Sequence, residues 1–262
     1  MPEGDTLHRT AAGLAPHLVG RPVIAARVRA GGPQVQRVVG ATITAVEAIG
    51  KNLLIRFDNG LELRTHLRMN GSWHRYRPGE RWRRPPARAR LVLEVPGAVA
   101  VCFDAPVVEL FESRAEAIHP ALARMGPDLL APDYGPNAAA EARRRLRDPE
   151  RAGLTISAAL LDQRALAGIG NIWRNETLFH GRTDPWARVS ELDDDALDGL
   201  VATARRLLRQ SVGEVPGRTP MWVYRRAGRP CRRCGTLVRS AAMTPDIPRT
   251  TYWCPTCQPT RA

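Results

Sequence analysis

The sequence predicts an α+β multidomain protein: an N-terminal antiparallel β-sandwich flanked by helices, then a C-terminal helical domain, then a small four-cysteine module. Three observations predict this order. Short alternating apolar runs fill residues 22–112, helical periodicity follows them, and two Cys-x-x-Cys pairs lie near the end of the chain. We expect the three parts to span 1–113, 114–221 and 222–262, with residues 216–220 as a linker.

The first part is predicted to begin with a helix over residues 5–19, capped by Asp5 or Thr6 and ended by the Gly-Arg-Pro that starts at Gly20. The alternating runs after it are expected to be strands, and the turns at 58–60 and 96–97 carry hairpin residues. Cys102, inside one such run, is expected to be a small core residue. Examples among these six or more expected strands are 23–28, 42–49, 53–57, 61–67, 91–95 and 99–103.

The second part is predicted to be helical over 138–147, 154–180 and 190–212. The third of these helices has the clearest pattern, because Ser190 and Asp193 can form a capping box and its apolar residues recur at helical spacing. Its expected buried stripe is Leu197, Leu200, Val201, Ala204, Leu207 and Leu208.

Charge and composition limit the function. The 262 residues carry a net charge of +13, and all but one of the 39 basic residues are arginine. Such a field favours a polyanionic partner, usually nucleic acid, although a GC-rich genome also favours arginine codons. The apolar runs are too short to span a membrane and the first residues do not resemble a signal peptide, so we expect a cytosolic protein.

The cysteine pairs are the strongest local signal. Cys231 and Cys234 are separated from Cys254 and Cys257 by 19 residues, which is the arrangement of a closed four-thiolate zinc site with a structural role. Eight arginines and one acid in 222–262 favour contact with phosphates, and an oligomerisation knuckle is the alternative.

Three further segments carry residues suited to nucleic-acid chemistry. Gly168-Ile-Gly-Asn171 offers backbone N–H groups near a helix start, which suits a phosphate oxygen, although glycine-rich turns between helices are common. His66-Leu-Arg-Met69-Asn-Gly ends a predicted strand, and Met69 is either a wedge inserted between bases or a core residue. Residues 75–90 hold seven arginines with Tyr76 and Trp82, which is typical of either a single-strand contact or a solvated hairpin loop.

The first residues have nucleophilic chemistry. Methionine before proline is normally excised, which would leave the secondary amine of Pro2 at the terminus, where amines titrate near neutral pH. Such an amine can attack a sugar C1′ and form an iminium, and Glu3 beside it can move protons. Lys51 is the one lysine in an arginine-rich chain, which is either a composition effect or a sign of a role that arginine cannot fill.

These motifs together resemble the formamidopyrimidine-DNA glycosylase and endonuclease VIII family, and the opening Pro2-Glu3-Gly4 is similar to its endonuclease VIII branch. The resemblance covers nearly the whole chain. It implies a bifunctional DNA glycosylase and abasic-site lyase of base excision repair. This enzyme would cleave by β- and δ-elimination and require only a structural zinc ion. It also implies a helix-two-turns-helix element near 154–180, damaged DNA as the partner, and a monomer in the bacterial cytoplasm at the nucleoid.

The resemblance assigns roles to matching positions. Pro2 becomes the Schiff-base nucleophile, Glu3 the general acid and base, and Lys51 the catalytic lysine at the phosphate beside the lesion. The residues it implies at the DNA are His66, Met69, Asn171, Glu176 and Arg249.

Some positions depart from the family pattern. Asp104-Ala-Pro leads into Val107-Val108, where one branch has Arg-Arg-Phe, so Met69 would fill the gap in the duplex without those side chains. This favours oxidised pyrimidines over 8-oxoguanine, with single-stranded or bubble DNA as a further substrate form. Asp5-Thr6 replaces a Pro-Glu pair, and the 19-residue cysteine spacing is longer than the family's.

Two other functions fit parts of the pattern. A non-catalytic binder of abasic or damaged DNA would have no use for Pro2, Glu3 and Lys51 together. A zinc-finger transcription factor would show a recognition helix or a dimer heptad, and the sequence has neither.

Overall fold

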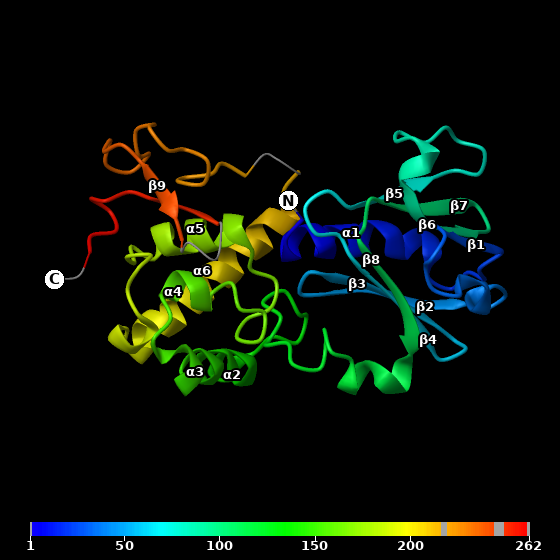
Figure 1. Cartoon of the computed structure of the whole chain (residues 1–262), viewed down its shortest axis with the longest axis horizontal. Coiled ribbons are helices and arrows are strands. Elements are labelled where there is room, and N and C mark those ends of the chain that lie inside the picture. The colour runs from blue at the N-terminus through cyan, green and yellow to red at the C-terminus, as the bar shows by residue number, and fades with distance from the viewer. Residues whose placement is uncertain (1, 216–218, 244–248, 261–262) are drawn as a thin grey trace. The chain divides into compact units, whose positions relative to one another are not determined.

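The computed structural model describes residues 2–215, 219–243 and 249–260, so part of the expected linker, 216–218, lies outside the described residues. The chain divides into two compact units, Met1–Arg124 and Met125–Ala262 (Figure 1). Each is described by itself. The finer division into 1–113, 114–221 and 222–262 stays a prediction.

The first unit begins with helix α1, Gly4–Leu18, which buries Leu7, Leu14 and Leu18. The predicted helix is confirmed, but its predicted cap is wrong. Glu3 occupies the cap position, and its carbonyl oxygen accepts from the backbone N–H groups of Thr6 at 3.0 Å and Leu7 at 3.1 Å. Because the helix starts earlier than expected, Asp5 lies inside its first turn.

Two antiparallel four-stranded sheets follow, as the predicted sandwich requires (Figure 1). Apolar side chains of both, among them Leu53 and Leu63 from one and Leu91 and Leu93 from the other, belong to one buried core that also includes the inner face of α1. Cys102 is fully buried in it, as predicted. In spatial order the first sheet is β1 (Ala25–Val28), β6 (Ala89–Val95), β7 (Ala98–Phe103) and β5 (Ser72–Tyr76), and the second is β2 (Ile43–Ile49), β3 (Asn52–Phe57), β4 (Leu61–His66) and β8 (Val107–Glu112).

Strands β5 and β8 lie outside the runs named as examples above. β5 contains histidine, serine and arginine, and β8 is half-buried along most of its length, so neither shows the alternation that marks a strand in sequence. Both are edge strands of their sheets. The predicted hairpin turns at 58–60 and 96–97 are confirmed, since they join β3 to β4 and β6 to β7. Three short 3₁₀ segments, Val35–Val38, Pro86–Arg88 and Ser113–Ile118, complete the unit.

The second unit is helical and ends in a two-stranded ribbon. The predicted stripe of α6 is buried as expected, whereas the predicted helix over 154–180 is interrupted between α4 and α5. Gly168 there has φ +99°, a conformation that helices exclude. The elements are α2 (Pro136–Leu146), α3 (Pro149–Ala152), α4 (Ile156–Ala159), α5 (Asn171–His180), the 3₁₀ turn Val189–Glu191, α6 (Asp194–Gly213), β9 (Arg239–Ala242) and β10 (Thr250–Trp253).

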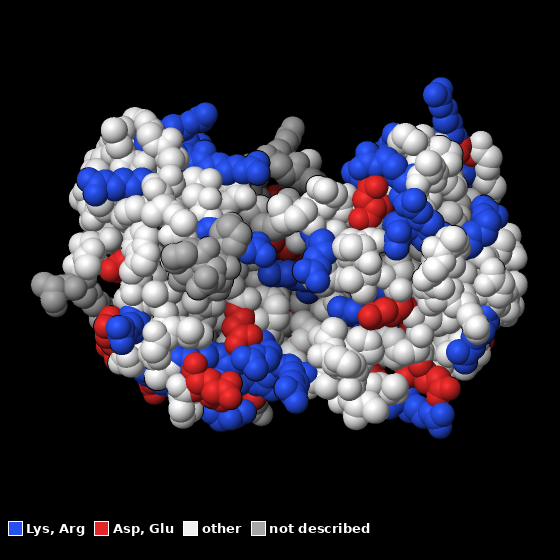
Figure 2. Space-filling view, viewed as in Figure 1, with Lys and Arg blue, Asp and Glu red and all other residues white. Residues whose placement is uncertain are grey.

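The predicted capping box at Ser190 is wrong, because Ser190 lies in the separate turn before α6. Asp193 caps α6, and its Oδ1 accepts from the N–H of Ala196 at 2.8 Å. Within the described ranges, no helix has the length and apolar character that crossing a bilayer requires. On the face drawn in Figure 2, Lys and Arg side chains are spread over both units, as the net charge leads one to expect.

Candidate active site and nucleic-acid interface

In the first unit, Pro2 lies next to a buried carboxylate. Pro2 is half-buried, and Glu3, at the cap position of α1, is only 1% exposed. Asp5, also buried, accepts from Arg9 at 3.1 Å. Met1 lies outside the described residues. Pro2 and the buried carboxylate of Glu3 are therefore consecutive in the chain.

Lys51 lies in a tight turn that buried hydrogen bonds hold in place. Ile49 and Asn52 are paired across β2 and β3, so Gly50 and Lys51 form a two-residue hairpin turn, with Gly50 at φ +58°. The buried amide of Asn52 donates to the carbonyl of Ile49 at 3.1 Å. Its oxygen accepts from Arg64 Nε at 2.9 Å. This buried network holds the turn, so the lysine projects from a defined backbone.

His66 pairs with Asn52 in the sheet register, which places it beside the Lys51 turn. Burial, and then the charges of Arg64, Arg68 and Lys51, lower the pKa of His66 to about 4. The imidazole is thus neutral at physiological pH. Its Nδ1 accepts from the N–H of Arg68 at 3.2 Å, so the ring proton is on Nε2. A cation and a neutral N–H donor side by side suit a phosphate oxygen.

Met69 projects from the turn after β4 with 59% of its surface exposed, so the alternative of a core methionine is wrong. The turn is constrained on both sides. Gly71 N–H donates to the carbonyl of Leu67 at 2.9 Å, and a Cβ on Gly71 would lie 2.6 Å from that oxygen. Arg84 donates to Asn70 O at 3.3 Å and to Asp104 at 2.8 Å. An apolar side chain on so constrained a turn can act as a wedge.

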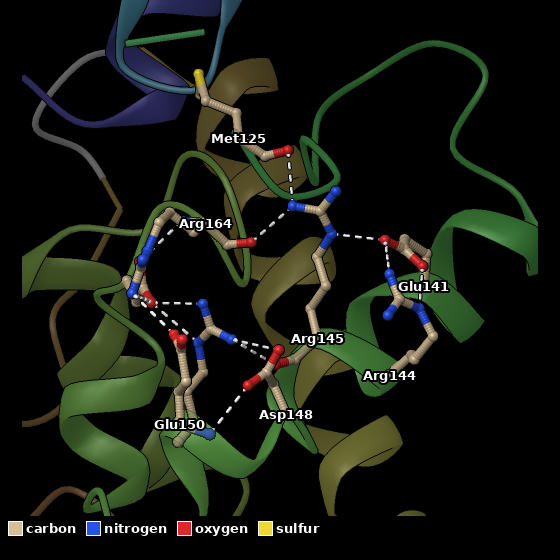
Figure 3. Close-up of polar contacts among 9 residues, drawn as sticks. Met125, Glu141, Arg144, Arg145, Asp148, Glu150 and Arg164 are labelled. Carbon is tan, nitrogen blue, oxygen red and sulfur yellow. Dashed lines mark hydrogen bonds and ion pairs between the residues drawn. The ribbon is translucent and has the colours of Figure 1, made fainter. Parts of the chain in front are cut away.

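In the second unit, Asn171 is the first residue of α5, directly after the Gly168–Gly170 turn. Gln163 holds that turn: its Oε1 accepts from Gly168 N–H at 3.1 Å, and its Nε2 donates to Ile169 O at 3.0 Å. Figure 3 shows how the segment before the turn is tied down, with Arg145 of α2 pointing toward the backbone oxygens of Met125 and Arg164.

Asn171 also connects α5 to β10. Its Nδ2 donates to Thr250 O at 3.2 Å, and its Oδ1 accepts from the buried Arg174 at 2.8 Å. Arg174 in turn donates to Thr250 O at 3.1 Å. Thr250 follows Arg249, so two predicted DNA-contact residues, Asn171 and Arg249, are brought to the same place. Arg174 was not predicted as a site residue. Its position one helical turn after Asn171 could have indicated that the two side chains are neighbours.

Glu176 lies 2% exposed in α5, where burial raises the pKa of its carboxyl. One oxygen accepts from the backbone N–H groups of Val223 and Tyr224 at 3.0 and 2.8 Å, and the other from Trp222 at 2.9 Å. Its assignment to DNA binding stays a prediction. The geometry gives Glu176 a positioning role, since it holds the segment that leads into the cysteine module.

The four sulfur atoms of Cys231, Cys234, Cys254 and Cys257 all lie within 4.8 Å of one another. Two of the sulfur pairs are 4.0 and 3.4 Å apart. Four thiolates around one zinc ion at a Zn–S distance of about 2.3 Å would be separated by about 3.8 Å. The cysteines are therefore arranged to hold one metal ion.

Comparison with known proteins agrees with both units. Residues 1–106 match the formamidopyrimidine-DNA glycosylase N-terminal domain, and residues 125–219 match the formamidopyrimidine-DNA glycosylase H2TH domain. The chain is 40% identical to "Probable endonuclease 8 2" of Streptomyces coelicolor, over 98% of this chain and 94% of that protein. It is 38% identical to "DNA-(apurinic or apyrimidinic site) lyase Nei2" of Mycolicibacterium smegmatis, over 98% and 99% of the two chains.

The fold is also similar to a solved structure. The MutM (Fpg) protein of Thermus thermophilus superposes with a TM-score of 0.82 at 27% identity, and the match covers 100% of both chains.

Proposed function

The chain belongs to the formamidopyrimidine-DNA glycosylase family, and from this premise we propose how its residues excise a damaged base. It is a DNA glycosylase and abasic-site lyase of base excision repair. The observation that best supports the detailed mechanism is the buried carboxylate of Glu3 directly after Pro2.

Pro2 is the nucleophile, once Met1 has been removed. Its amine attacks C1′ of the damaged nucleotide, the bond from C1′ to the base breaks, and the base leaves with a proton. Glu3 supplies and recovers the protons: its carboxyl group protonates the ring oxygen as the C1′–O4′ bond breaks and the Pro2 nitrogen forms a C1′=N bond, and the carboxylate can then accept a proton. The resulting iminium acidifies C2′–H. Loss of that proton expels the 3′ phosphate by β-elimination, and a second elimination expels the 5′ phosphate.

Other residues hold the DNA for this reaction. Lys51 and His66 bind the phosphate beside the lesion, the lysine by charge and the neutral histidine through Nε2–H. Met69 fills the space that the rotated nucleotide leaves. Asn171 and Arg249 bind backbone phosphates, with Glu176 and Arg174 keeping α5 and the cysteine module in place.

The four cysteines hold a zinc ion, which would supply rigidity to the module rather than chemistry at the lesion, because a closed four-thiolate sphere leaves no open position. Oxidised pyrimidines are the proposed main substrates. The enzyme would act as a monomer at the nucleoid in the bacterial cytoplasm.

Borohydride trapping tests the proposal. Protein with a mass-verified Pro2 terminus is incubated with DNA that carries an abasic site or 5-hydroxyuracil, and the adduct is mapped. An adduct at Pro2 that is absent from Pro2→Gly and from protein with Met1 retained is the expected result. Tight abasic-site binding without any adduct would instead make the protein a non-catalytic damage binder.

A further inference from the structure

The loop between β5 and β6 forms a basic surface that the mechanism above does not use. Trp82 lines two hollows there, one of about 690 Å³ formed by residues 80–86 and one of about 480 Å³ formed by residues 27–29, 82, 86, 87 and 89–92. We call all the residues that line either of these two hollows the Trp82 surface. Figure 2 shows Lys and Arg side chains gathered where Figure 1 places β5 and β6.

The loop has a defined path. Trp82 stacks on Tyr76 with ring centres 6.1 Å apart and meets Phe103 edge-on at 5.8 Å. The Tyr76 hydroxyl accepts from the N–H of Arg83 at 3.0 Å. Glu80 accepts from the N–H of Arg77 at 2.8 Å. These contacts fix the path of a loop whose residues 77–81, 83 and 85–88 are exposed.

Arginines in the loop and on this surface have two different roles. Arg84 and Arg88 both bind Asp104, at 2.8 and 2.7 Å, and so help to build the loop. Arg29, Arg81 and Arg83 are exposed, and no described residue forms a hydrogen bond or ion pair with their guanidinium groups. Their charges remain available to a partner.

Arginines outnumber acids on this surface. Of the residues that line the two hollows, all of them described, Glu80 is the one acid, and it already accepts from Arg77 N–H. Several cations held near one another repel, and an anion bound among them relieves that repulsion. A partly exposed indole between such cations adds a flat apolar face for a base.

We propose that the Trp82 surface binds an unpaired DNA strand, with its phosphates on Arg29, Arg81 and Arg83 and a base against Trp82. A duplex offers phosphates to this surface but keeps its bases stacked inside, so the indole favours a single strand. Arg84 joins the loop to Asn70, next to Met69, which allows one strand to run from the lesion to this surface. That the strand is DNA rests on the proposed function.

Paired charge removals test the electrostatic part. Binding of the full chain to fluorescein-labelled dT20 and to a 20-base-pair duplex is measured by anisotropy over a range of salt concentrations. The double variant Arg81→Ala/Arg83→Ala is compared with Arg37→Ala/Arg209→Ala, which removes the same charge from exposed side chains that form no hydrogen bond or ion pair with any described residue.

The loop variant is expected to bind dT20 about tenfold more weakly, with a salt slope smaller by about 1.4, or about 0.7 for each phosphate that the variant no longer neutralises. Its duplex affinity should fall by a smaller factor, because a duplex offers this surface phosphates but no base to hold it there. The control pair should change both affinities only slightly. Equal losses for the two double variants would show a general charge effect and overturn the inference.

A base-free strand tests the indole. An oligonucleotide of 20 tetrahydrofuran units keeps the phosphates of dT20 and lacks its bases. Wild-type protein should prefer dT20 by about five- to tenfold, and Trp82→Leu should lose this preference. Trp82→Phe preserves packing on Tyr76 and should show an intermediate preference, which keeps the test informative if Trp82→Leu is unstable. No preference in the wild type would overturn base stacking.

Borohydride trapping with the same proteins separates the two claims. A missing adduct in the wild type, with the difference between the double variants intact, overturns the proposed function and leaves single-strand binding standing. A normal adduct with no difference between the double variants overturns the single-strand surface and leaves the proposed function standing.

Discussion

Replacing Glu176 with glutamine is expected to loosen the connection between α5 and the cysteine module. The carboxylate accepts three backbone N–H groups, from Trp222, Val223 and Tyr224, at 2.8 to 3.0 Å. Glutamine has one oxygen and one NH₂ group. In either orientation of the amide, at least one of the three backbone donors therefore faces another donor.

The size of the effect follows from these contacts. A buried donor left without an acceptor costs about 1–3 kcal/mol, and each remaining bond loses about 1 kcal/mol when its acceptor is no longer charged. Burial that raises the pKa of the Glu176 carboxyl shows that the ionised form is itself costly, and glutamine relieves this cost. The net loss is about 2–3 kcal/mol, or about 4–12 °C in Tm at this chain length.

Thermal unfolding, metal retention and DNA affinity are the assays. Glu176→Gln should melt earlier, release metal to a chromogenic chelator sooner and bind abasic DNA more weakly, while Pro2 trapping at saturating protein remains. Glu214→Gln is the matched control, because its carboxylate accepts from the side chains of Gln210 and Thr219 near the end of α6 and should leave metal retention unchanged. A Tm for Glu176→Gln within about 1 °C of wild type, with unchanged metal retention, refutes the reasoning.

The remaining predictions concern the DNA-facing turn, His66 and the metal. Gly71→Ala should lower excision from duplex DNA at least about tenfold, because the added Cβ would lie 2.6 Å from Leu67 O. Gly199→Ala is the control and should keep its activity, because a Cβ there would meet no atom within 4 Å. Equal activity of the two variants would count against a role for the turn. The pKa of His66 is about 4 in the folded protein and about 6.5 in the unfolded chain. Between pH 4 and 6.5 the unfolded chain therefore binds more protons than the folded protein. The free energy of unfolding should fall as the pH drops from about 6.5 to 4. His66→Gln should flatten that decline in Tm; an unchanged pH profile contradicts the assigned pKa. A chelator should remove one metal equivalent and weaken DNA binding, and elemental analysis that finds no bound metal in freshly purified protein argues against the site.

Much of this protein could be predicted from local sequence patterns. The α6 stripe could be predicted because burial of one helix face repeats every three to four residues, and the hairpin turns because few residues tolerate their conformations. The cysteine spacing and the Pro2-Glu3 start could be recognised because their chemistry depends on neighbours in the chain. The resemblance to a glycosylase family rested on five such motifs, and the family comparisons confirm it.

Contacts between segments far apart in the chain leave no local pattern in the sequence and could not be predicted from it. The break in the predicted helix over 154–180 brings Asn171 to Thr250, 79 residues away, and Glu176 meets a backbone segment 46 to 48 residues away. Strand β5 pairs with β7 although buried and exposed residues do not alternate regularly along it. A hydrogen bond from a side chain to a remote backbone group places no demand on sequence periodicity. The sequence by itself therefore determined which chemistry this protein carries, whereas the tertiary structure decided which residues hold that chemistry in position.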